Sequence, residues 1–76
     1  MAVNKLSTVY FVGIKGTGVC ALAELMFNAG IKVCGSDIDE VFYTDAILKE
    51  LNIPYYNDFN PSRITADIDM VIHSAA

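Results

Sequence analysis

Apolar residues fall into blocks whose spacing changes along the chain. The first block, residues 9–12, is an unbroken run of β-branched and aromatic side chains that ends at Gly13, which is typical of a strand buried on both faces. From residue 17 to residue 29 the apolar side chains instead recur at helical spacing, and Gly30 follows where such a helix would end. The expected buried stripe of this helix comprises Val19, Leu22, Leu25 or Met26, and Ala29.

The same change of spacing repeats farther along the chain. It predicts short strands over residues 31–34, 53–56 and 70–74, a second helix that begins at residue 44 or 45, and a short helix over residues 61–66. Strands that alternate with helices in this order are joined by right-handed crossovers and form a parallel sheet. We therefore predict an α/β fold, a Rossmann-like parallel sheet with flanking helices on both faces.

Length and charge narrow the range of functions. With 76 residues the chain forms one domain at most, and 54% hydrophobic residues exclude a disordered tail. The net charge is −4 and the five basic residues are scattered, so nucleic-acid binding is not expected. The early apolar run is short and contains polar residues, which predicts neither a signal peptide nor a membrane span. Because the chain stops directly after the last predicted strand, we expect residues 1–76 to be a truncated N-terminal domain.

Cysteine and histidine residues give no sign of a metal site. Cys20 and Cys34 have no C-x-x-C spacing and no pair of histidines beside them, so we expect buried free thiols, which suit a reducing cytoplasm. His73 is the one histidine and lies at the end of the last predicted strand, where its side chain faces either the cleft or the core. A lone histidine is more often structural than catalytic, so no catalytic residue is assigned.

The glycine-rich turn carries the most specific motif. Residues 16–21 match G-x-G-x-x-G/A between a predicted strand and a predicted helix, which is the context that a dinucleotide-type fingerprint requires. Gly16 and Gly18 let the backbone approach a diphosphate closely, and the N–H groups of the first helical turn point at the anion. Lys15 would add a direct positive charge. No Lys-Ser or Lys-Thr pair follows Gly18, so the turn is not a Walker P-loop and no ATP site is predicted here.

Three loops are predicted to meet at one edge of the sheet. Ligands of open parallel sheets bind at the carboxyl ends of the strands, and here those ends lead into residues 13–18, 35–37 and 73–75. Asp37 lies near the position from which an acid reaches ribose hydroxyls in such folds, although a solvated turn acid is the alternative. The aromatic pair at 42–43 is either part of the core or a lid over a base.

Three blocks of residues, spaced and in order, together resemble the N-terminal domain of the Mur ligases. The first is V-G-I-K-G-T-G-V at 12–19, followed by A-L-A at 21–23. The others are G-S-D at 35–37 with Y-T-D at 43–45 before a leucine-rich helix, and D-M-V-I-H-S-A at 69–75. The resemblance covers nearly the whole chain and is nearest to the branch of the family that acts on UDP-N-acetylmuramate and L-alanine.

This resemblance implies a cytoplasmic enzyme of peptidoglycan synthesis. Such ligases use ATP and magnesium to activate the muramate carboxyl as an acyl phosphate, which the amine of L-alanine attacks. The first of their three domains holds the UDP part of the sugar nucleotide, the second carries the ATP loop, and the third helps to bind the amino acid. The present chain would be the first domain, inactive alone and without a cofactor of its own, with the UDP-sugar substrate and the remaining domains as its partners.

The resemblance also implies the substrate-binding residues. The glycine-rich turn would cradle the UDP diphosphate, Ser36 and Asp37 would lie beside the uridine, and Ser74 and Ala75 would line the same cleft. The residues of the turn are Gly13, Lys15, Gly16, Thr17, Gly18 and Val19.

Two positions depart from the family pattern. Lys15 stands where the family loop usually has its second glycine, so it either helps to bind the phosphates or partly obstructs the loop. Asp58 and Phe59 stand where many relatives have a Gly-His pair, so the role of that histidine does not transfer to this chain.

Three alternatives stay open. The strand, the glycine fingerprint and Asp37 also fit an NAD(H)-binding Rossmann domain of a dehydrogenase or of a regulatory module. Within the family, a ligase that attaches a recycled murein peptide to the same nucleotide would have the same first domain. Lys15 also allows a protein-interaction domain that kept the fold and lost the ligand. The extra Gly13, the G-S-D block and the Ser-Ala pair after the last strand favour the UDP-sugar.

Overall fold

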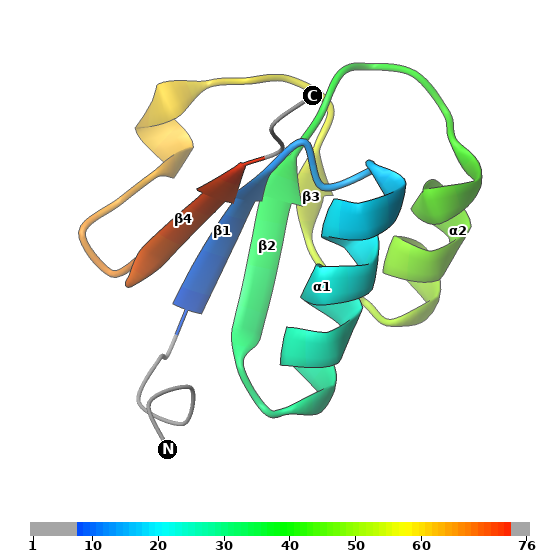
Figure 1. Cartoon of the computed structure of the whole chain (residues 1–76). Helices are drawn as coiled ribbons and strands as arrows, with labels where there is room; N and C mark the ends of the chain where they lie inside the picture. Colours follow the sequence, from blue (N-terminus) through cyan, green and yellow to red (C-terminus); the bar gives the residue numbers. More distant parts are fainter. Residues whose placement is uncertain (1–7, 74–76) are drawn as a thin grey trace.

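The computed structural model describes residues 8–73, which form a four-stranded parallel sheet with helices packed on it (Figure 1). The strand order is β3-β2-β1-β4, and all neighbouring strands are parallel. This arrangement confirms the predicted α/β, Rossmann-like class. The elements are β1 (Thr8–Val12), α1 (Thr17–Asn28), β2 (Lys32–Ser36), α2 (Tyr43–Glu50), β3 (Tyr55–Tyr56), the 3-10 turn η2 (Pro61–Arg63) and β4 (Met70–His73).

The unbroken apolar run of β1 is explained by its central place in the sheet. β1 pairs with β2 along one edge and with β4 along the other, so it is an interior strand, and its residues Thr8–Phe11 are buried. Val9 and Phe11 point into the main core, and alternation along the strand turns Tyr10 to the opposite face, where it is only 2% exposed. The carboxyl end of this central strand leads directly into the glycine-rich turn.

Both helices lie on the same face of the sheet (Figure 1). α1 packs on β2 and α2 packs against α1, and the core between them includes Ile14, Val33 and Leu48. Within residues 8–73 the connection from β3 back to β4 contains no α-helix but only η2 (Figure 1), so the expectation of helices on both faces is wrong for this part of the chain. A single 3-10 turn is too short to cover a sheet face.

The buried side of α1 agrees with the predicted stripe only in part, because Val19 and Met26 pack against the core but the leucines do not. Cys20 and Ala23 are buried against the sheet, whereas Leu25 is 67% exposed and Leu22 is also exposed. Small side chains at positions 20 and 23 let the helix approach the strands closely, and this rotates the larger leucines outward. Nearly every residue from 19 to 27 is apolar, so the sequence gives little contrast from which to find the buried side.

Some element boundaries also differ from the prediction. β2 extends to Ser36, because Ser36 pairs with Val12 on one side and Tyr56 on the other. β3 is limited to two residues, and the helix expected over 61–66 is only the η2 turn, which Asn60 caps by accepting a hydrogen bond from Ser62 N–H. Of the two free thiols, Cys20 is buried as expected but Cys34 is only half-buried.

β2 lies so close to the end of β1 and to the turn that follows it that only glycine fits at position 35. A Cβ there would lie 2.4 Å from the Phe11 carbonyl oxygen and 2.9 Å from Ile14 Cδ1. Gly35→Ala is therefore expected to lower the free energy of unfolding by about 1–3 kcal/mol, which is typical of overpacking. Urea unfolding followed by circular dichroism measures this change.

The matched control is Gly18→Ala in the first turn of α1. A Cβ at position 18 meets nothing within 4 Å, and alanine favours helix over glycine by up to about 1 kcal/mol, so stability should be kept or raised. Equal losses of stability in the two variants would contradict the close approach of β2 to the turn.

Candidate functional site

A pocket of about 640 Å³ opens at the carboxyl ends of β1 and β4. It brings together five residues predicted from the sequence, namely Gly13, Lys15, Gly16, Thr17 and Asp37. The rest of its lining consists of Val12, Phe42, Tyr43, Phe59 and His73. Four separate segments of the chain therefore meet here, as expected for the ligand-binding edge of an open parallel sheet.

The other predicted site residues lie around this pocket or outside the described residues. Gly18 and Val19 belong to the first turn of α1, directly after Thr17. Ser36 ends β2 and is buried. Ser74 and Ala75 lie outside the described residues, so their place in the cleft stays a prediction.

The glycine-rich turn is tied to the end of β2 by its own backbone. Gly13 has a φ of 83°, a left-handed conformation that favours glycine. The N–H groups of Gly13 and Ile14 both donate to the Ser36 carbonyl oxygen, at 2.8 and 3.1 Å, and Gly16 N–H donates back to the Gly13 carbonyl at 3.0 Å. These amides hold the shape of the turn and already donate to backbone carbonyls, so they are not available to a ligand.

The first turn of α1 supplies the amides that a ligand can use. Gly16 is the N-cap residue, and no side chain of the described residues caps the helix there. The first intrahelical bond of this end runs from Cys20 N–H to the Gly16 carbonyl at 2.7 Å. Helix geometry gives the preceding N–H groups, at residues 17–19, no acceptor within the helix. With no acidic side chain in that turn, this end of the helix can accommodate an anion.

Asp37 holds the glycine-rich turn in place. One of its carboxylate oxygens accepts a hydrogen bond from Lys15 N–H at 2.8 Å, and the other accepts one from Ile38 N–H at 2.7 Å. The contact of Asp37 with a ribose stays a prediction. What the structure shows is that Asp37 also fixes the backbone of the turn. Each oxygen keeps a lone pair for a further donor.

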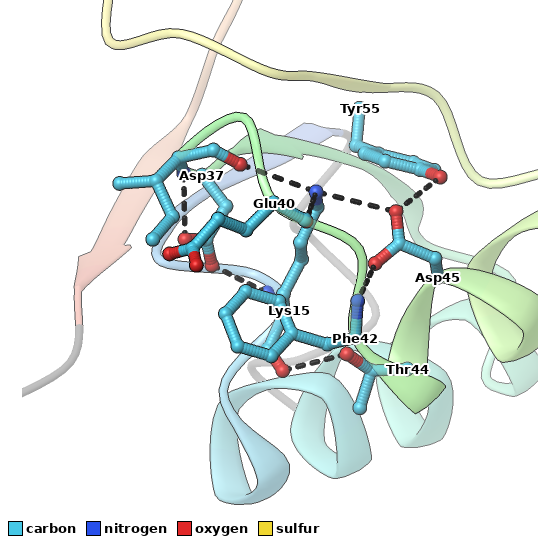
Figure 2. A network of polar contacts seen from close by, with 8 residues as sticks. Lys15, Asp37, Glu40, Phe42, Thr44, Asp45 and Tyr55 are labelled. Carbon is cyan, nitrogen blue, oxygen red and sulfur yellow. Dashed lines mark hydrogen bonds and ion pairs between the residues drawn. The ribbon is translucent and has the colours of Figure 1, made fainter.

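Lys15 points away from the expected phosphate position. Its ammonium is buried, since the residue is 4% exposed, and it forms an ion pair with Asp45 at 3.2 Å (Figure 2). It also donates to the carbonyl oxygens of Glu40 at 2.5 Å and Ile38 at 3.2 Å. The structure therefore does not show the expected direct charge on the turn, because a buried ammonium has to be paired with a nearby acceptor.

Asp45, the ion-pair partner of Lys15, was not among the site residues predicted from the sequence. Its side chain accepts hydrogen bonds from Phe42 N–H at 2.8 Å and from the Tyr55 hydroxyl at 2.9 Å. Burial raises the pKa of Asp45, but these two hydrogen bonds and the Lys15 ammonium outweigh it and leave the pKa below its ordinary value. Burial, and then the hydrogen bond and charge of Asp45, raise the pKa of Tyr55. The sequence did contain one signal for the role of Asp45, because an acid three residues after a helix N-cap often accepts a hydrogen bond from the N-cap amide.

Aromatic side chains form the outer wall of the pocket. Phe42, Tyr43 and Phe59 all line it and are all substantially exposed. The Tyr43 hydroxyl donates to Thr17 Oγ1 at 2.9 Å, which joins the starts of α1 and α2 across the pocket rim. Such a wall suits a flat base beside an anion site, so the lid interpretation of the 42–43 pair agrees with its position.

Residues 8–73 bring no three His, Cys, Asp or Glu side chains together in a group that could hold a metal ion. His73 lines the pocket, so its side chain faces the cleft and not the core.

Within residues 8–73 no helix is long and apolar enough to cross a membrane.

Comparison with known proteins gives a consistent result. A family model described as "Mur ligase family, catalytic domain" matches residues 8–76. The chain is 48% identical over 68 residues to the UDP-N-acetylmuramate--L-alanine ligase of Treponema pallidum, which covers 90% of this chain. It is 38% identical to the ligase of the same name from Borrelia garinii and 40% identical to that of Streptococcus mutans, which cover 96% and 95% of it.

A solved structure gives the same match in three dimensions. The crystal structure of UDP-N-acetylmuramate-alanine ligase from Thermotoga maritima has a TM-score of 0.78 and 36% identity, and the match covers 91% of this chain. The chain spans 14–16% of the length of the curated relatives and 16% of the Thermotoga chain. The similarity thus concerns a small part of those proteins.

The lowered pKa of Asp45 predicts a pH-dependent contribution to stability. In the folded state the pKa of this carboxyl group lies below its ordinary value of 3.8. Its contribution to the free energy of unfolding is therefore complete above pH 3.8 and is lost as pH falls through the lowered pKa. Asp45→Asn should lower the free energy of unfolding at pH 7 by about 3 kcal/mol, since it leaves Lys15 buried without its counter-charge. The difference from wild type should narrow below pH 3.8.

Denaturant unfolding at a series of pH values measures this difference. The control is Asp39→Asn, which removes an exposed acid from the same part of the chain. A gap between wild type and Asp45→Asn that does not change with pH would show that the carboxylate charge is not the stabilising feature.

Proposed function

Because the chain belongs to the Mur ligase family, we propose that it is the domain that binds UDP-N-acetylmuramate in a ligase that joins L-alanine to that nucleotide. The relatives that match it at 38–48% identity have this activity in their names. One observation of the structure carries the proposal: the uncapped first turn of α1 meets the 640 Å³ pocket at Thr17. An anion of the substrate would be bound by backbone amides at that end of the helix.

The pocket has room for the two halves of the nucleotide. In the proposed complex the N–H groups of residues 17–19 donate to the diphosphate, and Gly18 leaves open space for its oxygens. The uridine lies toward Asp37 and the aromatic wall of Phe42 and Tyr43. The resemblance implies that Ser74 and Ala75, which lie outside the described residues, line the same cleft.

Bond formation is assigned to other parts of the parent enzyme. In the proposed ligase, which acts in the cytoplasm, ATP and magnesium would activate the muramate carboxyl. Residues 8–73 do not fit these cofactors, because the glycine-rich turn lacks the Lys-Ser or Lys-Thr of an ATP loop and no group of three metal-ligating side chains is formed. The chain alone would bind substrate without turning it over, and its partners are the remaining domains of the ligase.

A titration followed by NMR tests the assignment. Addition of UDP-N-acetylmuramate to the isotope-labelled chain should shift the amide signals of residues 17–19 and of Asp37, whereas NADH at the same concentration should leave them in place. Shifts with NADH alone would instead support the dinucleotide-binding alternative. No shift with either compound in a folded chain would contradict the proposed function.

Gly18→Val tests the close approach of the ligand to the helix. The free protein has space for the new side chain, but the diphosphate would be displaced, so affinity for the nucleotide should fall at least about tenfold, or 1.4 kcal/mol. The matched control is Leu25→Val, which places the same β-branched residue at an exposed position of α1 beyond the pocket. Equal affinity in the folded Gly18→Val variant would refute the assignment of the first turn.

A further inference from the structure

Every polar group of Lys15 is bound to the stretch that runs from the end of β2 into the first turn of α2. This stretch, residues 37–45, is called the 37–45 segment below. The Lys15 N–H donates to Asp37, and its carbonyl oxygen accepts a hydrogen bond of 2.7 Å from the buried Thr44 hydroxyl. Its ammonium contacts the remaining partners, which are the carbonyl oxygens of Ile38 and Glu40 and the carboxylate of Asp45 (Figure 2).

The 37–45 segment forms one side of the pocket. Asp37, Phe42 and Tyr43 line the pocket and all come from this segment. Residues 38–42 lie outside helices and strands, and Val41 is 90% exposed, so this stretch has little packing of its own. The position of the pocket wall therefore depends on what holds the segment to the rest of the protein.

The Lys15 ammonium is a strong anchor because it is removed from water. Two carbonyl oxygens and a carboxylate surround it, and the rings of Tyr55 and Phe42 lie 5.5 and 5.9 Å from it. Without the ammonium, the carbonyl oxygens of residues 38 and 40 would lose their donor, and Asp45 would lose its counter-charge. Those groups would recover their hydrogen bonds only by turning toward water, which moves the segment.

We propose that Lys15 is a positioning residue for the nucleotide pocket: together with Asp45 it holds the 37–45 segment where Asp37, Phe42 and Tyr43 face the glycine-rich turn, without contacting the phosphates itself. This inference rests on the proposed function and adds a division of tasks to it. The first turn of α1 binds the diphosphate, and the segment that Lys15 holds receives the nucleoside. The charge of Lys15 is neutralised by Asp45 and contributes little to anion binding.

Two soluble probes separate positioning from direct phosphate contact. UDP occupies both halves of the pocket, whereas inorganic pyrophosphate occupies only the diphosphate half. In Lys15→Met the affinity for UDP should fall about tenfold, while the affinity for pyrophosphate should stay within about twofold of wild type. NMR titration of the full 76-residue chain with each probe gives both values.

Matched variants complete the test. Lys49→Met removes an exposed lysine of α2 and should change neither affinity. Asp45→Asn changes no residue of the glycine-rich turn and should reproduce the selective loss of UDP affinity. This second variant keeps the inference testable even where Lys15→Met does not fold. Because the two residues act as a pair, the double variant should lose no more than the stronger single variant.

Three results would overturn the inference or separate it from the proposed function. Equal losses of UDP and pyrophosphate affinity would show that Lys15 contacts phosphate directly, and unchanged UDP affinity in a folded Lys15→Met chain would show that it positions nothing. A wild-type chain that binds neither probe would refute the proposed function itself. In that case, hydrogen exchange of the Phe42 amide decides the anchoring role: faster exchange in Lys15→Met supports it, and unchanged exchange overturns it.

Discussion

A lysine ammonium that is removed from water has to be surrounded by acceptors, and this requirement organises the pocket side of the molecule. Lys15 meets it with Asp45 in the first turn of α2 and with two backbone carbonyls in the connection between β2 and α2. Asp45 in turn caps the start of α2 through Phe42 N–H and accepts a hydrogen bond from Tyr55 in β3. One buried ion pair thus joins the glycine-rich turn, the second helix and an edge strand.

This pairing changes how the pocket handles negative charge. A lysine beside a phosphate-binding turn suggests direct charge attraction, but here the ammonium is neutralised before any ligand arrives. In the proposed complex the anion is bound by oriented backbone amides at the start of α1, which need no mobile side chain. We propose that the ion pair sets the position of the opposite wall, with Asp37 and the two aromatic side chains, which would receive the nucleoside.

The sequence predicted the fold well because β1 and the glycine-rich turn follow local rules. An unbroken apolar strand, a left-handed Gly13 and a helix behind it are all determined by neighbouring residues. The partner of Lys15 could not be predicted in this way, because Asp45 lies thirty positions farther along and only the packing of α2 beside α1 brings it near. The outward rotation of Leu22 and Leu25 was missed for a related reason, since in a helix that is apolar nearly all round the tertiary contacts decide which side is buried.

In the proposed complex, backbone amides of α1 bind the diphosphate while the Lys15 ammonium stays paired with Asp45. A crystal structure of the chain with UDP-N-acetylmuramate tests it most directly. We expect the diphosphate oxygens within hydrogen-bonding distance of the N–H groups of residues 17–19, with the Lys15 ammonium still paired with Asp45. A diphosphate bound elsewhere, or a Lys15 side chain that has left Asp45 to contact it, would contradict this account.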